Sequence, residues 1–297
     1  MFDRSQGLNI TLKAFAKINL GLDIIGKRED GYHLLRMVMQ SAGIYDTLEF
    51  EITDAPDITL VCDNADIPTD GRNLVCKAVK LIKERYDIRE GVSVRLTKRI
   101  PSAAGLAGGS ADAAATIAAM NTLFDLGLDS ATMADIGLEL GADIPFCLMG
   151  GTALAEGVGE KLTPLDAMPD CAILLVKPEC GISTREAYQA IDGAKPSVRP
   201  DIDGIVSALK ARDLEAVCGS MANVFEPVSI EKHPEIEIIK KKMLDFGAIN
   251  AMMSGSGPTV FGIFADRDAA QRAFEAFKRS EYGKDVFLTG PVETGIG

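Results

Sequence analysis

A glycine-rich segment in the first half of the chain has the residue types of an anion-binding loop. Residues 101–112 read PSAAGLAGGSAD and precede an alanine-rich run that is typical of a helix. Glycine tolerates positive φ and lets the backbone approach a ligand, while the helix N-terminus adds the positive end of its dipole. Backbone N–H groups here can therefore surround the oxygens of a polyphosphate. The positions expected to make these contacts are Pro101, Ala103, Ala104, Gly105, Leu106, Ala107, Gly108, Gly109, Ser110 and Ala111.

This segment differs from two common nucleotide-binding motifs. It lacks the Gly-Lys-Ser/Thr ending of a P-loop, and it is not a GxGxxG after a strand at the start of the chain. One structural alternative stays open, in which Gly105 to Gly109 form only a tight strand-to-helix turn and Ser110 is the helix N-cap. Residues elsewhere in the chain must decide between the two interpretations.

The charge balance of the chain argues against a nucleic-acid partner. The 43 acidic and 31 basic residues give a net charge of -12, so most of the surface would repel a phosphate backbone. No run reaches the roughly 18 apolar residues of a membrane span. Residues 1–12 show no secretory signal. We therefore expect a cytoplasmic protein that binds neither nucleic acid nor membrane.

The six cysteines contain no CxxC pair, and their irregular spacing suits neither a zinc site nor a disulfide framework. We expect reduced, buried thiols. They are Cys62, Cys76, Cys147, Cys171, Cys180 and Cys218.

Outside this loop, the spacing of apolar residues alternates along the chain between the period of a helix and that of a strand. This pattern predicts a mixed α and β fold. The length of 297 residues favours two domains, at 1–160 and 161–297. Strands are predicted at 10–24, 47–53, 92–96, 171–176, near 251 and at 260–264, with a hairpin at 152–162. Helices are predicted at 73–86, 111–124, 131–140, 185–191, 202–209, 235–246 and 268–279. An exposed turn is predicted at 27–31, and a connecting turn at Asp143 and Pro145.

Three separated segments resemble motifs of the GHMP kinases, the superfamily of galactokinase, homoserine kinase, mevalonate kinase and phosphomevalonate kinase. The AFAKINL run at 14–20 resembles the first motif, residues 101–113 the phosphate loop, and SGSGPTV at 254–260 the C-terminal glycine motif. The family usually carries glycine in place of Ala107. The resemblance implies an ATP-dependent small-molecule kinase of α+β class with two lobes. The N-terminal lobe would be like ribosomal protein S5 domain 2, and the C-terminal lobe ferredoxin-like.

Four further segments resemble the branch of this family that phosphorylates the 2-hydroxyl of a cytidine-diphosphate-linked methylerythritol in the non-mevalonate isoprenoid pathway. They are KINLGL at 17–22, KREDGYHL at 27–34, GADIPFC at 141–147 and GISTREAY at 181–188. Two alternatives stay open. One is a relative that acts on homoserine, mevalonate or a sugar, and the other is a non-catalytic nucleotide-binding protein on the same scaffold.

The resemblance implies roles for two charged residues. Asp143 would accept the proton of the attacking hydroxyl, and Lys17 would neutralise developing charge and keep Asp143 ionised. Asp143 could instead be a helix or turn cap, and Lys17 a solvated strand-edge residue. ATP would bring Mg²⁺, whose protein ligands are unknown from the sequence.

Five further residues are expected to contact the substrate or ATP. Tyr32 and Tyr188 would stack on the cytosine base, and His33 would hydrogen-bond to it. Asn19 would orient the substrate and Asn73 would contact adenine. Tyr188 could instead face the core, and both asparagines could be turn or cap residues. A monomer or a homodimer is expected.

Overall fold

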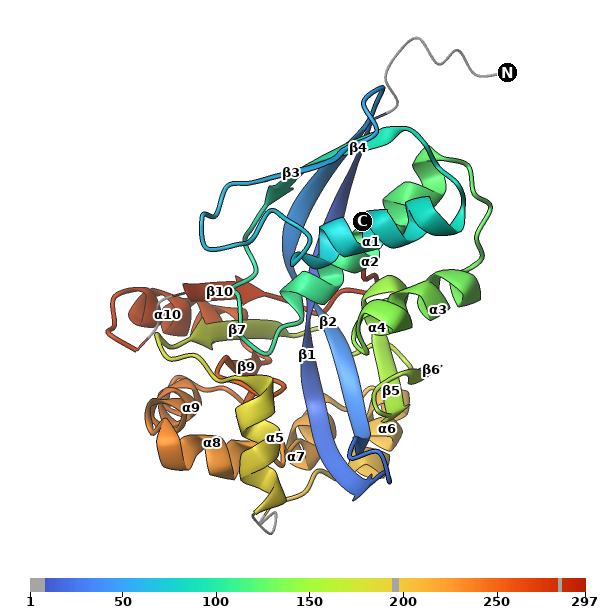
Figure 1. The fold of residues 1–297 in the computed structure, drawn as a ribbon. Coiled ribbons are helices and arrows are strands. Elements are labelled where there is room, and N and C mark those ends of the chain that lie inside the picture. The colour runs from blue at the N-terminus through green and yellow to red at the C-terminus, as the bar shows by residue number, and fades with distance from the viewer. Residues whose placement is uncertain (1–8, 194–197, 283–284) are drawn as a thin grey trace.

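The computed structural model describes residues 9–193, 198–282 and 285–297, and within them two sheets organise the chain (Figure 1). Residues 1–8, part of the segment searched for a secretory signal, lie outside the described residues. In the described part, a six-stranded sheet has the order β3-β4-β2-β5-β6 with β1 paired to β2, and a four-stranded sheet has the order β10-β7-β9-β8. The two-lobed α+β class is confirmed.

The first sheet is built around a long antiparallel hairpin. Its strands are β1 (Asn9–Lys27), β2 (His33–Thr53), β3 (Ile58–Cys62), β4 (Gly91–Thr97), β5 (Thr152–Gly157) and β6 (Lys161–Pro164). The strands predicted at 10–24 and 92–96 and the hairpin at 152–162 are confirmed, whereas β3 was not predicted. The division of domains at residue 160 stays a prediction.

The second strand begins much earlier than predicted. The segment at 47–53 is only the end of β2, which starts at His33. Met37 and Met39 lie in one core cluster and Val38 in another, so both faces of β2 are buried. A strand buried on both faces lacks the alternation of apolar and polar residues that marks a half-buried strand. That pattern explains the error.

Four helices of the N-terminal lobe support the glycine-rich loop. They are α1 (Leu74–Arg85), α2 (Gly108–Leu123), α3 (Ser130–Leu140) and α4 (Ile144–Met149). Phe50 of β2 shares a core with Val79 of α1 and Ile117 of α2. Most of α2 is buried, and its small alanine side chains let neighbouring elements approach closely.

Two local predictions in this lobe are wrong. Helix α2 begins at Gly108 rather than at Ala111, so Ser110 lies in its first turn and is not the N-cap. The turn predicted to hold both Asp143 and Pro145 ends at Asp143, and Pro145 lies in the first turn of α4. Proline is tolerated there because the N–H groups of a first helical turn have no intrahelical partner.

The second lobe contains β7 (Ala172–Lys177), β8 (Asn250–Met253), β9 (Val260–Phe264) and β10 (Asp285–Thr289). Its helices are α5 (Thr184–Asp192), α6 (Ile202–Ala211), α7 (Leu214–Ser220), α8 (Glu226–Lys232), α9 (Glu235–Asp245) and α10 (Arg267–Lys278). Strands β7 to β9 and helices α5, α6, α9 and α10 match the predictions. Strand β10 and the short helices α7 and α8 were not predicted.

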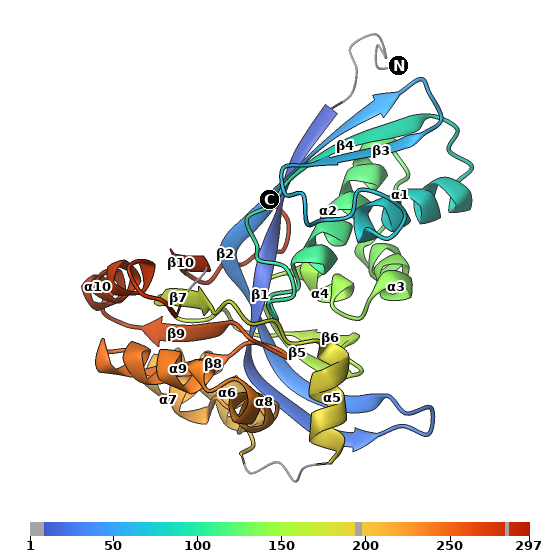
Figure 2. The same cartoon turned by 60° about the vertical axis from the view of Figure 1, so that its left-hand side comes forward.

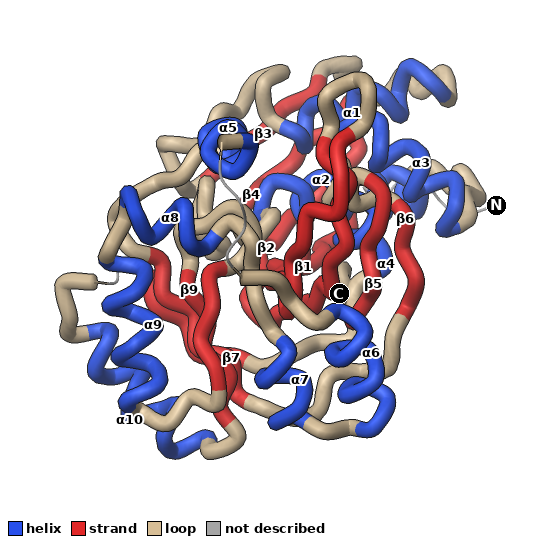
Figure 3. The backbone as a smooth tube through the Cα atoms, turned by 90° about the horizontal axis from the view of Figure 1, so that it is seen from below, coloured by secondary structure: helices blue, strands red, loops and turns tan. Residues whose placement is uncertain are grey.

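The second sheet is covered on both faces, as Figures 2 and 3 let the reader follow. Leu174 of β7 shares a core with Ile239 of α9 and Ala273 of α10. Ile173, on the opposite face of β7, shares a different core with Leu209 of α6. The chain end returns to the first sheet, where Gly297 N donates to Lys13 O at 3.0 Å. None of the helices in the described residues has the length and apolarity that a membrane crossing requires.

Candidate active site

A cavity of about 1100 Å³ is lined by both lobes. Fifteen of the seventeen residues predicted for the site line it: Lys17, Asn19, Tyr32, His33, Asn73, Pro101, Ala103, Ala104, Gly105, Ala107, Gly108, Gly109, Ser110, Asp143 and Tyr188. Leu106 and Ala111 do not, because their side chains are buried in the core. The carbonyl of Leu106 instead accepts a bond from Lys17 N at 3.1 Å, which joins the loop to β1.

The glycine-rich loop has a backbone suited to anions. Ala103, Gly105 and Ala107 have φ of 49°, 75° and 56°, so left-handed residues alternate along the loop. Such alternation turns successive N–H groups toward one point and forms an anion-binding concavity. The loop then enters α2, whose first N–H groups have no helical acceptor. A polyphosphate fits this donor set.

The turn at residues 254–257 packs directly on that loop. A Cβ added to Gly105 would lie 2.1 Å from the carbonyl oxygen of Ser254, so only glycine fits. Ser254 Oγ donates to the carbonyl of Gly105 at 3.0 Å. The two glycine segments therefore form one unit, although 149 residues separate them.

Lys17 and Asn19 lie on β1 at the floor of the cavity. The Lys17 ammonium is only 5% exposed and donates to Asn19 Oδ1 at 2.8 Å. Asn19 is fully buried, and its Nδ2 contacts Met37 Sδ at 3.3 Å. Because Lys17 takes part in no ion pair among the described residues, its charge is free to act on a ligand.

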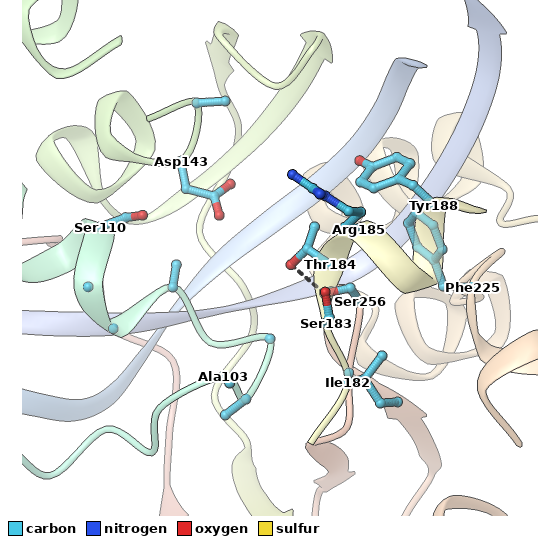
Figure 4. A pocket seen from close by; sticks show the side chains of 18 of the residues that line it. Ala103, Ser110, Asp143, Ile182, Ser183, Thr184, Arg185, Tyr188, Phe225 and Ser256 are labelled. Carbon is cyan, nitrogen blue, oxygen red and sulfur yellow. Dashed lines mark hydrogen bonds between the residues drawn. The ribbon is translucent and has the colours of Figure 1, made fainter. Parts of the chain in front are cut away.

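Asp143 reaches the cavity from the start of α4. Its carboxylate does not cap the helix, contrary to the structural alternative, and Figure 4 shows it extending into the cavity. No ion pair joins it to Lys17 within the described residues. Both charges nevertheless act on the thiol of Cys147: burial raises the pKa of this group, and Asp143 and Lys17 then shift it in opposite directions.

The other end of the cavity is aromatic. Tyr188 of α5 stacks on His33 with ring centroids 4.8 Å apart and planes at 27°. Phe225 meets the edge of Tyr188 at 4.9 Å. His33 Nε2 donates to Asp192 Oδ1 at 2.7 Å, and Nδ1 has no partner among the described residues. Tyr32 is 64% exposed at the rim.

Asn73 is the N-cap of α1. Its Oδ1 accepts from Val75 N at 2.9 Å and its Nδ2 donates to Pro68 O at 2.7 Å. The capping alternative is therefore correct. Its contact with adenine stays a prediction, which the remaining donor and acceptor of the amide still allow.

Comparison with known proteins agrees with this geometry. Residues 73–151 match the GHMP kinases N terminal domain, and residues 205–284 match the GHMP kinases C terminal domain. The 4-diphosphocytidyl-2-C-methyl-D-erythritol kinase of Lachnoclostridium phytofermentans is 48% identical over 94% of this chain and 96% of its own length. The enzyme of the same name from Clostridium beijerinckii is 48% identical over 94% of this chain and 98% of its own length. The chain belongs to this family of GHMP kinases.

Solved structures support the same family. A crystal structure of 4-(cytidine 5'-diphospho)-2C-methyl-D-erythritol kinase matches with a TM-score of 0.79 at 31% identity, covering 95% of this chain and 99% of that one. A homoserine kinase from Cytophaga hutchinsonii matches with a TM-score of 0.80 at 21% identity, covering 100% and 99% of the two chains. At 21% identity, the match to the homoserine kinase shows a shared fold alone.

The sequence did not reveal a buried ion cluster beside the phosphate loop of this GHMP kinase. Lys98 Nζ donates to Asp46 and, at 2.8 Å, to Asp112 Oδ2. Asp46 Oδ1 also accepts from Ile100 N at 2.9 Å, so the cluster fixes the chain that enters the loop. Asp112 Oδ1 is buried and has no hydrogen-bond partner in the part of the chain that the structure describes. Burial, together with the Asp46 charge, raises the pKa of Asp112 to about 7 against the pull of Lys98.

Arg185 is a second residue whose role the sequence did not reveal. It lies inside the GISTREAY segment, yet the segment alone does not indicate which of its side chains face a ligand. In the structure Arg185 lines the cavity, and its guanidinium extends between Asp143 and Tyr188 (Figure 4). It forms no ion pair among the described residues. An unpaired guanidinium in this position can bind a phosphate group.

Proposed function

We propose that the chain transfers the γ-phosphate of ATP to the 2-hydroxyl of 4-diphosphocytidyl-2-C-methyl-D-erythritol, a step of the non-mevalonate isoprenoid pathway. One observation carries the proposal. The same cavity is lined by the glycine-rich loop, by the charged residues Lys17 and Asp143, and by the aromatic rings of His33 and Tyr188. Family membership at 48% identity over nearly the whole chain supports the same reaction.

ATP would bind with its phosphates in the glycine-rich loop. The alternating left-handed backbone and the first turn of α2, whose N–H groups have no acceptor within the helix, offer donors to the phosphate oxygens. Mg²⁺, when bound with ATP, would neutralise part of the negative charge of the phosphates. Ser110 offers a hydroxyl oxygen at the start of α2, and Mg²⁺ prefers oxygen ligands. Asn73 would meet the adenine end.

Phosphoryl transfer depends mainly on positioning and charge compensation. In the proposed step the substrate hydroxyl oxygen attacks the γ-phosphorus, a new P–O bond forms, and the bond to the β-phosphate oxygen breaks to release ADP. Asp143 accepts the hydroxyl proton. Lys17, held by Asn19, compensates the negative charge that spreads over the phosphoryl oxygens. Lys17 and Asn19 are supplied by β1, and Asp143 is supplied by the N-cap position of α4.

Cytosine would bind at the aromatic end. The stacked rings of His33 and Tyr188 offer a flat surface on which a base can stack. The hydrogen bond to Asp192 Oδ1 keeps a proton on His33 Nε2, so Nδ1 is the ring nitrogen available to accept a hydrogen bond from the exocyclic amine of cytosine. Tyr32, exposed at the rim, would cover the base.

Arg185 would bind the diphosphate that links the two ends of the substrate. Its guanidinium extends between the aromatic pocket and Asp143, which is where a linker between base and sugar alcohol would run. The net charge of -12 makes a local cation necessary for an anionic substrate.

A substrate panel tests the proposal. ADP release is measured with 4-diphosphocytidyl-2-C-methyl-D-erythritol, homoserine, mevalonate and galactose at equal concentrations. We expect turnover with the cytidyl substrate alone, since only that substrate uses both ends of the cavity. Turnover with one of the other alcohols and none with the cytidyl substrate would overturn the proposal.

A further inference from the structure

Three side chains with metal-binding atoms meet outside the kinase cavity. They are Cys180, His233 and Glu235, and their ligand atoms all lie within 4.8 Å of one another. Cys180 lies in the loop between β7 and α5, whereas His233 and Glu235 flank the junction of α8 and α9. His233 Nδ1 and a Glu235 carboxylate oxygen are already 3.5 Å apart.

The ligand atoms of Cys180, His233 and Glu235 favour a particular metal ion. Thiolate sulfur, imidazole nitrogen and carboxylate oxygen are the three donor types that bind Zn²⁺ in proteins. Neighbouring ligands of tetrahedral Zn²⁺ lie roughly 3.2–3.8 Å apart, given metal–ligand bonds of about 2.0–2.3 Å. The His233–Glu235 separation of 3.5 Å falls in this range. The Cys180 sulfur lies within 4.8 Å of both of these ligand atoms.

We propose that Cys180, His233 and Glu235 form a Zn²⁺ site with water as the fourth ligand. All three residues are partly buried, so an ion can enter from solvent while the ligands stay ordered. The side chain of His233 is 27% exposed. The site is independent of the proposed kinase reaction.

Binding of Zn²⁺ at Cys180 must displace a proton and must tolerate a neighbouring positive charge. Zn²⁺ binds cysteine as the thiolate, so binding at Cys180 would release the thiol proton to solvent. The nearby cation is Lys177, whose ammonium donates to the carbonyls of Pro178 at 3.0 Å and Cys180 at 3.1 Å. Its charge opposes a metal ion but favours the thiolate. The two bonds also fix the backbone that carries Cys180.

Such a site would connect two parts of the second lobe. The Cys180 loop continues into Ile182 and Thr184, which line the kinase cavity, and then into α5. Helix α5 packs beside α8 (Figure 2). A metal bound by Cys180 and His233 would therefore join the cavity wall to α8 and α9 and stabilise it.

Metal titration of the whole purified chain tests the proposal. The protein is first treated with a chelator, dialysed, and then titrated with Zn²⁺ or Co²⁺ in the absence of nucleotide. We expect one Zn²⁺ per chain, a higher Tm, and a thiolate-to-cobalt charge-transfer band in the near ultraviolet. Binding of neither metal, or Co²⁺ binding without the thiolate band, would overturn the proposal.

Substitutions locate the ion. Cys180→Ser and His233→Asn should each weaken Zn²⁺ binding at least about tenfold and remove the rise in Tm. Cys62→Ser is the matched control, since Cys62 is also a partly buried free cysteine but lies far along the chain in β3. It should bind Zn²⁺ as the unchanged protein does. Equal binding by the Cys180 and His233 variants, or loss in the Cys62 variant, contradicts the site.

Discussion

Ser254 donates its hydroxyl to the carbonyl of Gly105 at 3.0 Å and thereby joins the two glycine segments of the kinase. The turn from the second lobe therefore supports the loop proposed to hold phosphate.

Gly105→Ala should disrupt this support. A Cβ at this position would lie 2.1 Å from the Ser254 carbonyl oxygen, and φ of +75° is strained for alanine. We expect ATP affinity to fall at least about tenfold, measured by titration calorimetry, with a lower Tm. Gly71→Ala is the control, because nothing lies within 4 Å of its added Cβ. Unchanged ATP affinity in the Gly105 variant would contradict the packing.

Asp192→Asn should weaken cytidyl-substrate binding through His33. The hydrogen bond of 2.7 Å fixes which nitrogen of His33 carries its proton. A bond to a charged group contributes about 1.5–3 kcal/mol, so we expect KM for the cytidyl substrate to rise about tenfold or more. KM for ATP should not change. The control is Asp203→Asn, which removes an exposed partner of Arg36; an equal effect from both variants would exclude the proposed role.

Arg185→Gln should also raise KM for the cytidyl substrate, and the effect should shrink as salt concentration increases. Ionic strength screens the attraction between a guanidinium and a diphosphate. We expect an increase of about tenfold at low salt, measured by steady-state kinetics. Arg267→Gln, which removes an exposed ion pair with Asp170, should leave KM unchanged. If Arg185→Gln behaves like this control, the diphosphate lies elsewhere.

Asp112 should make stability depend on pH. Its pKa is raised from 3.8 to about 7, first by burial, so between these values the folded chain holds one proton more than the unfolded chain. The free energy of unfolding should therefore fall as pH rises from about 4 to about 7, by at most about 1.4 kcal/mol per unit for one proton.

Urea unfolding at pH 5 and pH 7 measures this contribution. Asp112→Asn cannot titrate, so it should lose less stability over the interval than the unchanged chain. Carboxylates with lowered pKa values, such as Asp63 and Asp70, titrate at more acidic pH and are present in both proteins. Identical pH dependence in the two proteins would show that Asp112 stays ionised.

The sequence predicts those parts of the site that depend on local chemistry. Glycines before an alanine-rich helix indicate the phosphate loop, and its resemblance to GHMP kinases extends the expectation to Lys17, Asp143 and the aromatic residues. Long-range pairing leaves no such local signal. Asp46 and Lys98 are 52 positions apart, and Cys180 and His233 come from different elements. Helix α7 was missed for a different reason: with seven residues it is too short for its period to be clear.

The role of Asp143 is tested by the rate of phosphoryl transfer by Asp143→Asn in a single turnover with the cytidyl substrate. The change removes the proposed proton acceptor, and the Asp143 side chain makes no capping hydrogen bond to α4 that could be lost. We expect a rate about 10²–10⁴-fold lower, with ATP affinity and Tm unchanged. A variant that transfers phosphate as fast as the unchanged chain would contradict the assignment of Asp143 as the base.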